Sequence, residues 1–180
     1  MKPRVGISRC LLGDDVRYDG TNKRSNAVIA LGEDVEWLPV CPEVEVGMGV
    51  PREPIQLVAT IHAVASERER VRLQGVDSRE DWTGRMDRWA RDRVAALAAE
   101  RVSGFVLKAR SPSCGPTGVL VHYDDASPTP NGRGLFAEQL ATAIPGLPMI
   151  DEEALDDPAA RADFIRRVRA FDAGIGRTNT

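Results

Sequence analysis

Three short apolar runs, each followed by a cysteine or by a loop that carries one, constrain this chain more than any other sequence feature. The runs cover residues 5–8, 35–40 and 104–108 and have the length and composition of buried strands. Cys10, Cys41 and Cys114 follow them in that order. In an open parallel sheet, the loops at the carboxyl ends of the strands meet at one edge, where ligands bind. The sequence therefore predicts that the three distant cysteines are neighbours in space.

Further strand-like runs alternate with helical patterns and indicate a mixed α/β fold. The runs lie at residues 56–63, 119–122 and 148–150. The helical patterns cover residues 22–31, 79–102, 134–143 and 157–171, and Thr21 or Asn22 is the expected cap of the first. Residues 126–132 are rich in turn formers and are expected to form a loop. This order predicts an open parallel sheet with helices on its faces, in a single domain.

Charge and hydropathy exclude several classes of protein. The chain has 24 basic and 27 acidic residues, which gives no footprint for tight nucleic-acid binding. Its start lacks the apolar core of a signal peptide, and no apolar run approaches the roughly 20 residues that span a bilayer. We therefore expect a cytoplasmic protein without membrane contact. In that reducing compartment, three cysteines without a CxxC pair are either inert packing or metal ligands.

The surroundings of the cysteines favour metal binding. Pro42 follows Cys41, and Ser113 and Gly115 flank Cys114, so these thiols lie in turns rather than in strand interiors. Backbone N–H groups in tight turns stabilise thiolate and sulfide charge. Three cysteines suit zinc with a fourth ligand as well as iron, and their spacing does not separate the two. If a 4Fe-4S cubane binds, one iron has no cysteine ligand, which favours catalysis over electron transfer.

Five ordered motifs, including all three cysteines, resemble the thiouracil desulfidase family. They are SRCLLG at 8–13, VRYDG at 16–20, CPEV at 41–44, GMGVPR at 47–52 and KARSPSCG at 108–115. The resemblance implies a Rossmann-like fold with an open, mostly parallel sheet and helices on both faces. It also implies a 4Fe-4S cluster held by Cys10, Cys41 and Cys114, with one open iron, in an enzyme that replaces a thiocarbonyl sulfur with oxygen and releases hydrogen sulfide.

The resemblance also sets expectations for organisation and substrate. We expect one domain over residues 1–180, with the desulfidase-like region at 4–145, a helical extension at 146–173 and a frayed tail at 174–180. The expected substrate is a small thiolated nucleobase or nucleoside, not intact tRNA, and the expected assembly is a monomer or a small homo-oligomer. Arg9 and Thr21 depart from the family pattern, and both changes bear on substrate choice rather than on cluster binding.

Glu43, Ser111 and Ser113 are the candidate catalytic residues. Glu43 lies two residues after Cys41 and is the candidate general base for water. Its alternative role is that of a solvated loop carboxylate. The two serines lie in the loop of Cys114, where they either cap backbone groups or pass a proton to the substrate.

Arg17, Asp19 and Lys108 are the candidate substrate-binding residues, because each can hydrogen-bond to an amide-like ring edge. Exposed salt bridges are the alternative for all three. Two other functions stay open for the chain as a whole. One is a non-catalytic iron–sulfur redox or iron sensor, and the other is a zinc hydrolase with three cysteine ligands, which the missing HxE and PCxxC signature disfavours. An open iron also predicts sensitivity to oxygen.

Overall fold

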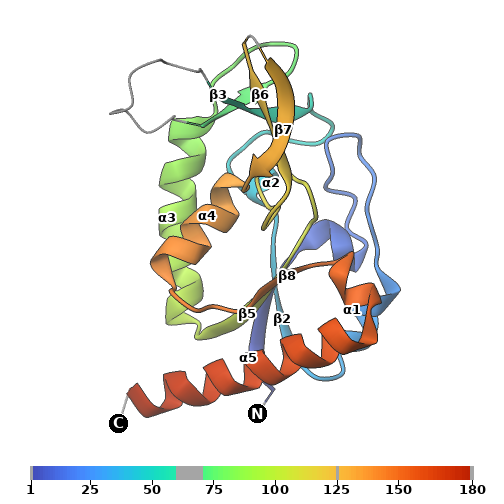
Figure 1. Ribbon diagram of the computed structural model, residues 1–180, viewed down its shortest axis with the longest axis vertical. Coiled ribbons are helices and arrows are strands. Elements are labelled where there is room, and N and C mark those ends of the chain that lie inside the picture. The colour runs from blue at the N-terminus through green and yellow to red at the C-terminus, as the bar shows by residue number, and fades with distance from the viewer. Residues whose placement is uncertain (1, 60–70, 125, 179–180) are drawn as a thin grey trace.

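An all-parallel sheet contains the three strands that precede the cysteines. The computed structural model of the protein describes residues 2–59, 71–124 and 126–178. The parallel sheet has the order β2-β1-β5-β8 (Figure 1). Its strands are β1 (Arg4–Ser8), β2 (Glu36–Val40), β5 (Val102–Leu107) and β8 (Met149–Asp151). The chain places β2 on one side of β1 and later places β5 on the other side. The loops after β1, β2 and β5 therefore open at one edge of the sheet.

Helices cover both faces of the parallel sheet. On one face, Ile7 and Val106 pack against α1 (Asn26–Leu31) and α5 (Pro158–Thr178). On the other, Phe105 and Leu107 pack against α3 (Thr83–Ala99) and α4 (Leu135–Ala143), which lie together at the left of Figure 1. Successive side chains of a strand point to opposite faces, which is why β5 is buried along its whole length. The predicted α/β fold with helices on both faces is therefore confirmed.

A second, mixed sheet has the order β4-β3-β6-β7. Its strands are β3 (Ile55–Ala59), β4 (Arg72–Gly75), β6 (Val119–Tyr123) and β7 (Ala126–Gly132). The prediction of a loop at 126–132 is wrong, since these residues pair antiparallel with β6. The prolines of β7 are tolerated because β7 is an edge strand. The predicted strand residues 60–63 lie outside the described residues.

The mixed sheet joins the parallel sheet in a single domain. Trp89 of α3 packs against the core of the α3–α4 face and also against the core beneath the mixed sheet. Three short helices complete the fold: η1 (Arg9–Leu12), α2 (Pro42–Glu45) and η2 (Ala154–Asp156). Within the described part of the chain, no helix has the length and apolarity needed to cross a bilayer.

Several helix boundaries differ from the predicted ones for local reasons. The predicted helix at 79–102 is shorter, because Arg79 and Arg101 adopt positive φ angles of 62° and 61° that end regular helix. Helix α1 begins later than predicted, and Ser25, rather than Thr21 or Asn22, caps it by accepting a hydrogen bond from the Val28 N–H.

The C-terminal region also differs from the prediction. Helix α5 includes residues 174–178 of the predicted tail, and residues 179–180 lie outside the described part. A glycine inside a helix lowers the stability of the helix by only about 1 kcal/mol, which is too little to end the helix. The extension at 146–173 is not wholly helical, because β8 pairs with β5 and adds a strand to the parallel sheet.

Candidate functional site

A cavity of about 350 Å³ opens at the carboxyl edge of the parallel sheet. Its wall comes from the loops after β1, β2 and β5 and from the segment before β3, and consists of residues 8–10, 16–18, 23, 40–43, 52, 54–55 and 108–114. All three cysteines are in this lining. The predicted convergence of Cys10, Cys41 and Cys114 is therefore confirmed, whereas their role as ligands stays a prediction.

The three thiols are buried and need a positive partner to ionise. Burial raises the pKa of Cys10 to about 12 and raises the pKa values of Cys41 and Cys114 as well. For Cys41, the positive charges of Arg52 and Arg9 act weakly in the opposite direction. A buried thiolate becomes favourable when a metal centre binds it. The donor set therefore fits a metal-containing group.

The arrangement of donors bears on which metal group fits. Among residues 2–59, 71–124 and 126–178, no three His, Cys, Asp or Glu side chains are arranged to hold a metal ion. The ligands of a single zinc lie about 2.3 Å from it, whereas a cluster distributes its thiolates over several irons. Three buried thiols around one cavity are compatible with a group that distributes its thiolates over several irons.

Helix α4 holds the loop that carries Cys114. The N–H groups of Gly134 and Phe136 donate to the carbonyls of Gly115 and Ser113, at 2.9 and 3.0 Å. The loop thereby satisfies donors that a helix start leaves without an intrahelical partner. A Cβ atom on Gly134 would lie 2.5 Å from the backbone carbonyl of Ser113. Glycine at this position thus permits the close contact that places Cys114 at the cavity.

We expect Gly134→Ala to lower the free energy of unfolding by about 1–3 kcal/mol, because the added methyl group displaces either the cysteine loop or α4. Urea denaturation measures this loss. Gly174→Ala in α5 is the control, since its Cβ would meet nothing within 4 Å. That substitution should leave stability unchanged or raise it by about 1 kcal/mol. A Gly134→Ala protein as stable as the wild type would contradict the close packing of loop and helix.

Glu43, Ser113 and Ser111 form a hydrogen-bonded chain along the cavity. The hydroxyl of Ser113 donates to Glu43 Oε1 at 2.7 Å and lies 3.0 Å from the hydroxyl of Ser111. Ser113 is only 1% exposed, so its hydroxyl makes few contacts with water. Ser111 Oγ also accepts the N–H of Cys114 at 3.2 Å. The three predicted catalytic residues thus lie together, in an arrangement suited to moving a proton.

Arg52 lines the cavity and Glu152 contacts lining residues, and the sequence assigned no role to either of them. Arg52 forms a buried ion pair with Glu43, and Glu152 receives hydrogen bonds from the Lys108 ammonium and from the N–H of Ala109. Arg52 lies in the GMGVPR motif, and this motif was the sequence signal that could have identified it as a functional residue. Glu152 lies outside all five motifs and 44 residues from Lys108, so no local pattern pointed to it.

The three predicted substrate-binding residues divide into two groups. Arg17 and Lys108 line the cavity, whereas Asp19 does not. Asp19 instead accepts hydrogen bonds from Thr21 Oγ1 at 2.7 Å and from Arg17 at 3.3 Å. Thr21, one of the two residues that depart from the family pattern, therefore contacts Asp19. Arg9, the other departure, lines the cavity and is paired with a neighbouring aspartate.

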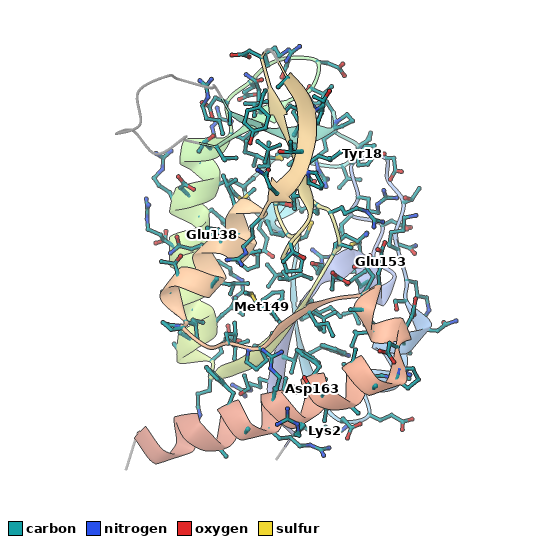
Figure 2. The ribbon with its side chains drawn as sticks, in the orientation of Figure 1. Lys2, Tyr18, Glu138, Met149, Glu153 and Asp163 are labelled. Carbon is teal, nitrogen blue, oxygen red and sulfur yellow. The ribbon has the colours of Figure 1, made fainter. Side chains whose placement is uncertain are left out.

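Basic side chains concentrate around the cavity, although the chain as a whole carries a net charge of −3. Glu43 is the one carboxylate of the lining, whereas six basic residues belong to it: Arg9, Arg17, Lys23, Arg52, Lys108 and Arg110. Five of the six pair with carboxylates. Tyr18 is the aromatic residue of the lining, 39% exposed, and lies at the outer side of the molecule in Figure 2. Overall composition did not predict this local concentration of charge.

Comparisons with known proteins match most of the chain. A family model described as 2-thiouracil desulfurase matches residues 5–152, which include β8. The uncharacterized protein YbbK of Bacillus subtilis (strain 168) is 29% identical over 152 residues, or 84% of this chain and 97% of that relative. A solved structure of a [4Fe-4S]-dependent thiouracil desulfidase, TudS, is 30% identical and matches with a TM-score of 0.67. That match covers 90% of this chain and 99% of the solved one.

Proposed function

This chain belongs to the 2-thiouracil desulfurase family, and on that premise we propose that it replaces the thiocarbonyl sulfur of a small thiolated nucleobase or nucleoside with oxygen. The proposed reaction converts a thiocarbonyl and water into a carbonyl and hydrogen sulfide, without a net redox change. One observation carries the proposal: three buried cysteines and the Glu43–Ser113–Ser111 chain line the same cavity.

Cys10, Cys41 and Cys114 would hold a 4Fe-4S cluster through their thiolates. When bound in this way, the cluster supplies an iron without a cysteine ligand, a Lewis acid suited to soft sulfur. Lys108 and Arg52 also line the cavity, and their charges favour the thiolate forms of Cys10 and Cys41, respectively. The sequence has no fourth cysteine, which supports a role of the cluster in substrate binding over a role in electron transfer.

Glu43 is the proposed general base. Its Oε2 is held by Arg52, so Oε1, which accepts from Ser113, is the oxygen that takes a proton from the attacking water. Ser113 lies between Glu43 and Ser111, and this pair of hydroxyls carries a proton toward the departing sulfur. Proton transfer along a chain of hydroxyls requires separations near 2.7–3.0 Å, which these groups have.

The remaining lining residues would bind the substrate ring. Lys108 and Arg17 donate hydrogen bonds to the ring carbonyl, and Asp19, which lies outside the lining, orients Arg17 through its 3.3 Å contact. Tyr18 offers an aromatic face to a planar base. A volume of about 350 Å³ is at the lower end of the range for small-molecule sites, which fits a single base better than a polymer.

Anaerobic purification followed by two measurements tests this proposal. Iron and sulfide are counted per chain, and sulfide release from 2-thiouracil and from 4-thiouridine is followed with time. Four irons per chain together with catalytic sulfide release support the proposal. A fully loaded protein that turns over neither compound would favour the sensor alternative, and stoichiometric zinc would favour the hydrolase.

We expect turnover of free 2-thiouracil to change by less than about twofold between roughly 0.02 and 0.15 M salt, because a neutral base has no charge for salt to screen. Intact thiolated tRNA should be a poor substrate, since a protein that binds several phosphates shows a steep loss of affinity with salt. Steady-state rates across a salt series measure both. Efficient sulfur removal from tRNA that collapses on adding salt would contradict this expectation and assign a phosphate-binding role to the basic lining.

A further inference from the structure

We propose that Arg52 is a positioning residue that fixes the orientation of the Glu43 carboxylate, an inference that rests on the function proposed above. The two side chains form an ion pair in which Arg52 is 6% and Glu43 is 14% exposed. Bulk solvent therefore has little contact with either group, and the protein partners of Glu43 supply most of its hydrogen bonds. Such a pair holds its geometry more strictly than a surface salt bridge does.

The guanidinium binds one oxygen of the carboxylate and leaves the other to the serine chain. Its Nε and Nη2 groups both donate to Glu43 Oε2, at 2.9 and 2.5 Å. Oε1 is left to the hydroxyl of Ser113 at 2.7 Å. Tilting the carboxylate out of its present plane would weaken all three hydrogen bonds, so Arg52 fixes the plane in which the second oxygen faces the serine chain. A lysine ammonium supplies charge without this planar fork of donors.

Arg52 is itself fixed by the backbone. Its Nη1 donates to the carbonyl of Gly49 at 2.7 Å, and its Nη2 donates to the carbonyl of Val16 at 2.9 Å. The Cys41 thiol also approaches the Val16 carbonyl, at 3.9 Å. The guanidinium thus joins the loop after η1, the loop before β3 and helix α2, which carries Glu43. These contacts make Arg52 a rigid support for Glu43.

Steady-state kinetics of Arg52→Met test the role directly. We expect kcat for 2-thiouracil to fall about 10²-fold, since a displacement of about 1 Å in a reacting group can cost that much. KM should change by less than about threefold, because the ring-binding groups are untouched. Arg52→Lys should recover only part of the loss. Iron content and the melting temperature, measured on the same preparations, report whether the cofactor and the fold survive.

A double-mutant cycle separates action through Glu43 from any other role. If Arg52 acts only by placing that carboxylate, Arg52→Met in the Glu43→Gln background should change kcat by less than about twofold. The matched control is Arg93→Met, which removes another arginine paired with a glutamate of helix α2, Glu45. Arg93 lies outside the cavity lining, so its loss should leave kcat near the wild-type value.

Four results would contradict the positioning role of Arg52 in a protein whose wild-type form is active. One is full activity in Arg52→Met, and a second is a multiplicative loss in the double mutant. A third is a rise in KM at constant kcat, which would make Arg52 a substrate ligand. The last is loss of iron in both the Met and the Lys variants, which would make its role structural. An inactive wild-type holoenzyme would instead refute the proposed function itself.

Discussion

Replacing Cys10, Cys41 or Cys114 with alanine should remove the bound iron and reduce turnover to background in each of the three variants. The three thiols are the only cysteines of the chain, so no other thiolate can take the place of a lost one. Each lies at the cavity end of a different loop, and a cluster held at two points would be open to solvent and oxidants. Iron and sulfide per chain, visible absorption and sulfide release, all measured anaerobically, check the prediction.

The fold should survive these cysteine substitutions. A domain of this size has enough apolar core without a structural metal, and each change removes only a small side chain. Far-UV circular dichroism and a cooperative urea transition are therefore expected in all three variants. Leu120→Ala is a useful control, because Leu120 is exposed on β6 of the mixed sheet and absent from the cavity lining. Full iron loading in any one cysteine variant would remove that cysteine from the ligand set.

Glu43→Gln should retain the cluster and lose about 10²–10⁴-fold in kcat, the usual contribution of general base catalysis. Glutamine preserves the shape of the side chain, and its amide oxygen can still accept the hydrogen bonds from Arg52, while its NH2 group faces the hydroxyl oxygen of Ser113. It cannot take a proton from water, so the loss falls on the chemical step. Single-turnover measurements with 2-thiouracil separate that step from product release.

A matched control for Glu43→Gln is Glu138→Gln. Glu138, labelled in Figure 2, is an exposed glutamate of α4 that also pairs with an arginine, Arg133, and it does not belong to the cavity lining. Its substitution should leave kcat unchanged. Near-normal turnover in Glu43→Gln would instead assign water activation to another group. Loss of iron from that variant would show that the carboxylate supports the cluster rather than the reaction.

The elements that were predicted correctly carry strong local signals. Helix α4 was predicted at 134–143, because its apolar residues recur at helical spacing. Strand β5 was predicted from a continuous apolar run and is fully buried. Strand β7, by contrast, has an almost wholly exposed sequence containing Pro128 and Pro130. Its extended form depends on pairing with β6, a contact that its own residues do not encode.

The predicted convergence of the three cysteines was correct, because chain order suffices for it. Cysteines after parallel strands must meet at the carboxyl edge, so the sequence predicted their convergence. Two polar contacts of the site, one hydrogen bond and one ion pair, follow another rule, because they join residues far apart in the chain. Ser113 and Glu43 are separated by 70 positions, and Lys108 and Glu152 by 44. Only the packing of loops from different strands decides which of the many acidic residues meets each of these partners.

The sequence by itself therefore determined the α/β fold, the edge at which the cysteines gather and the family to which the chain belongs, since these depend on residue order and local periodicity. The tertiary structure alone decided that Arg52 holds one oxygen of Glu43 and that basic residues surround the cavity despite the net charge of −3. Hydrogen bonds and ion pairs act over a few ångströms in space, and folding sets those distances independently of separation along the chain.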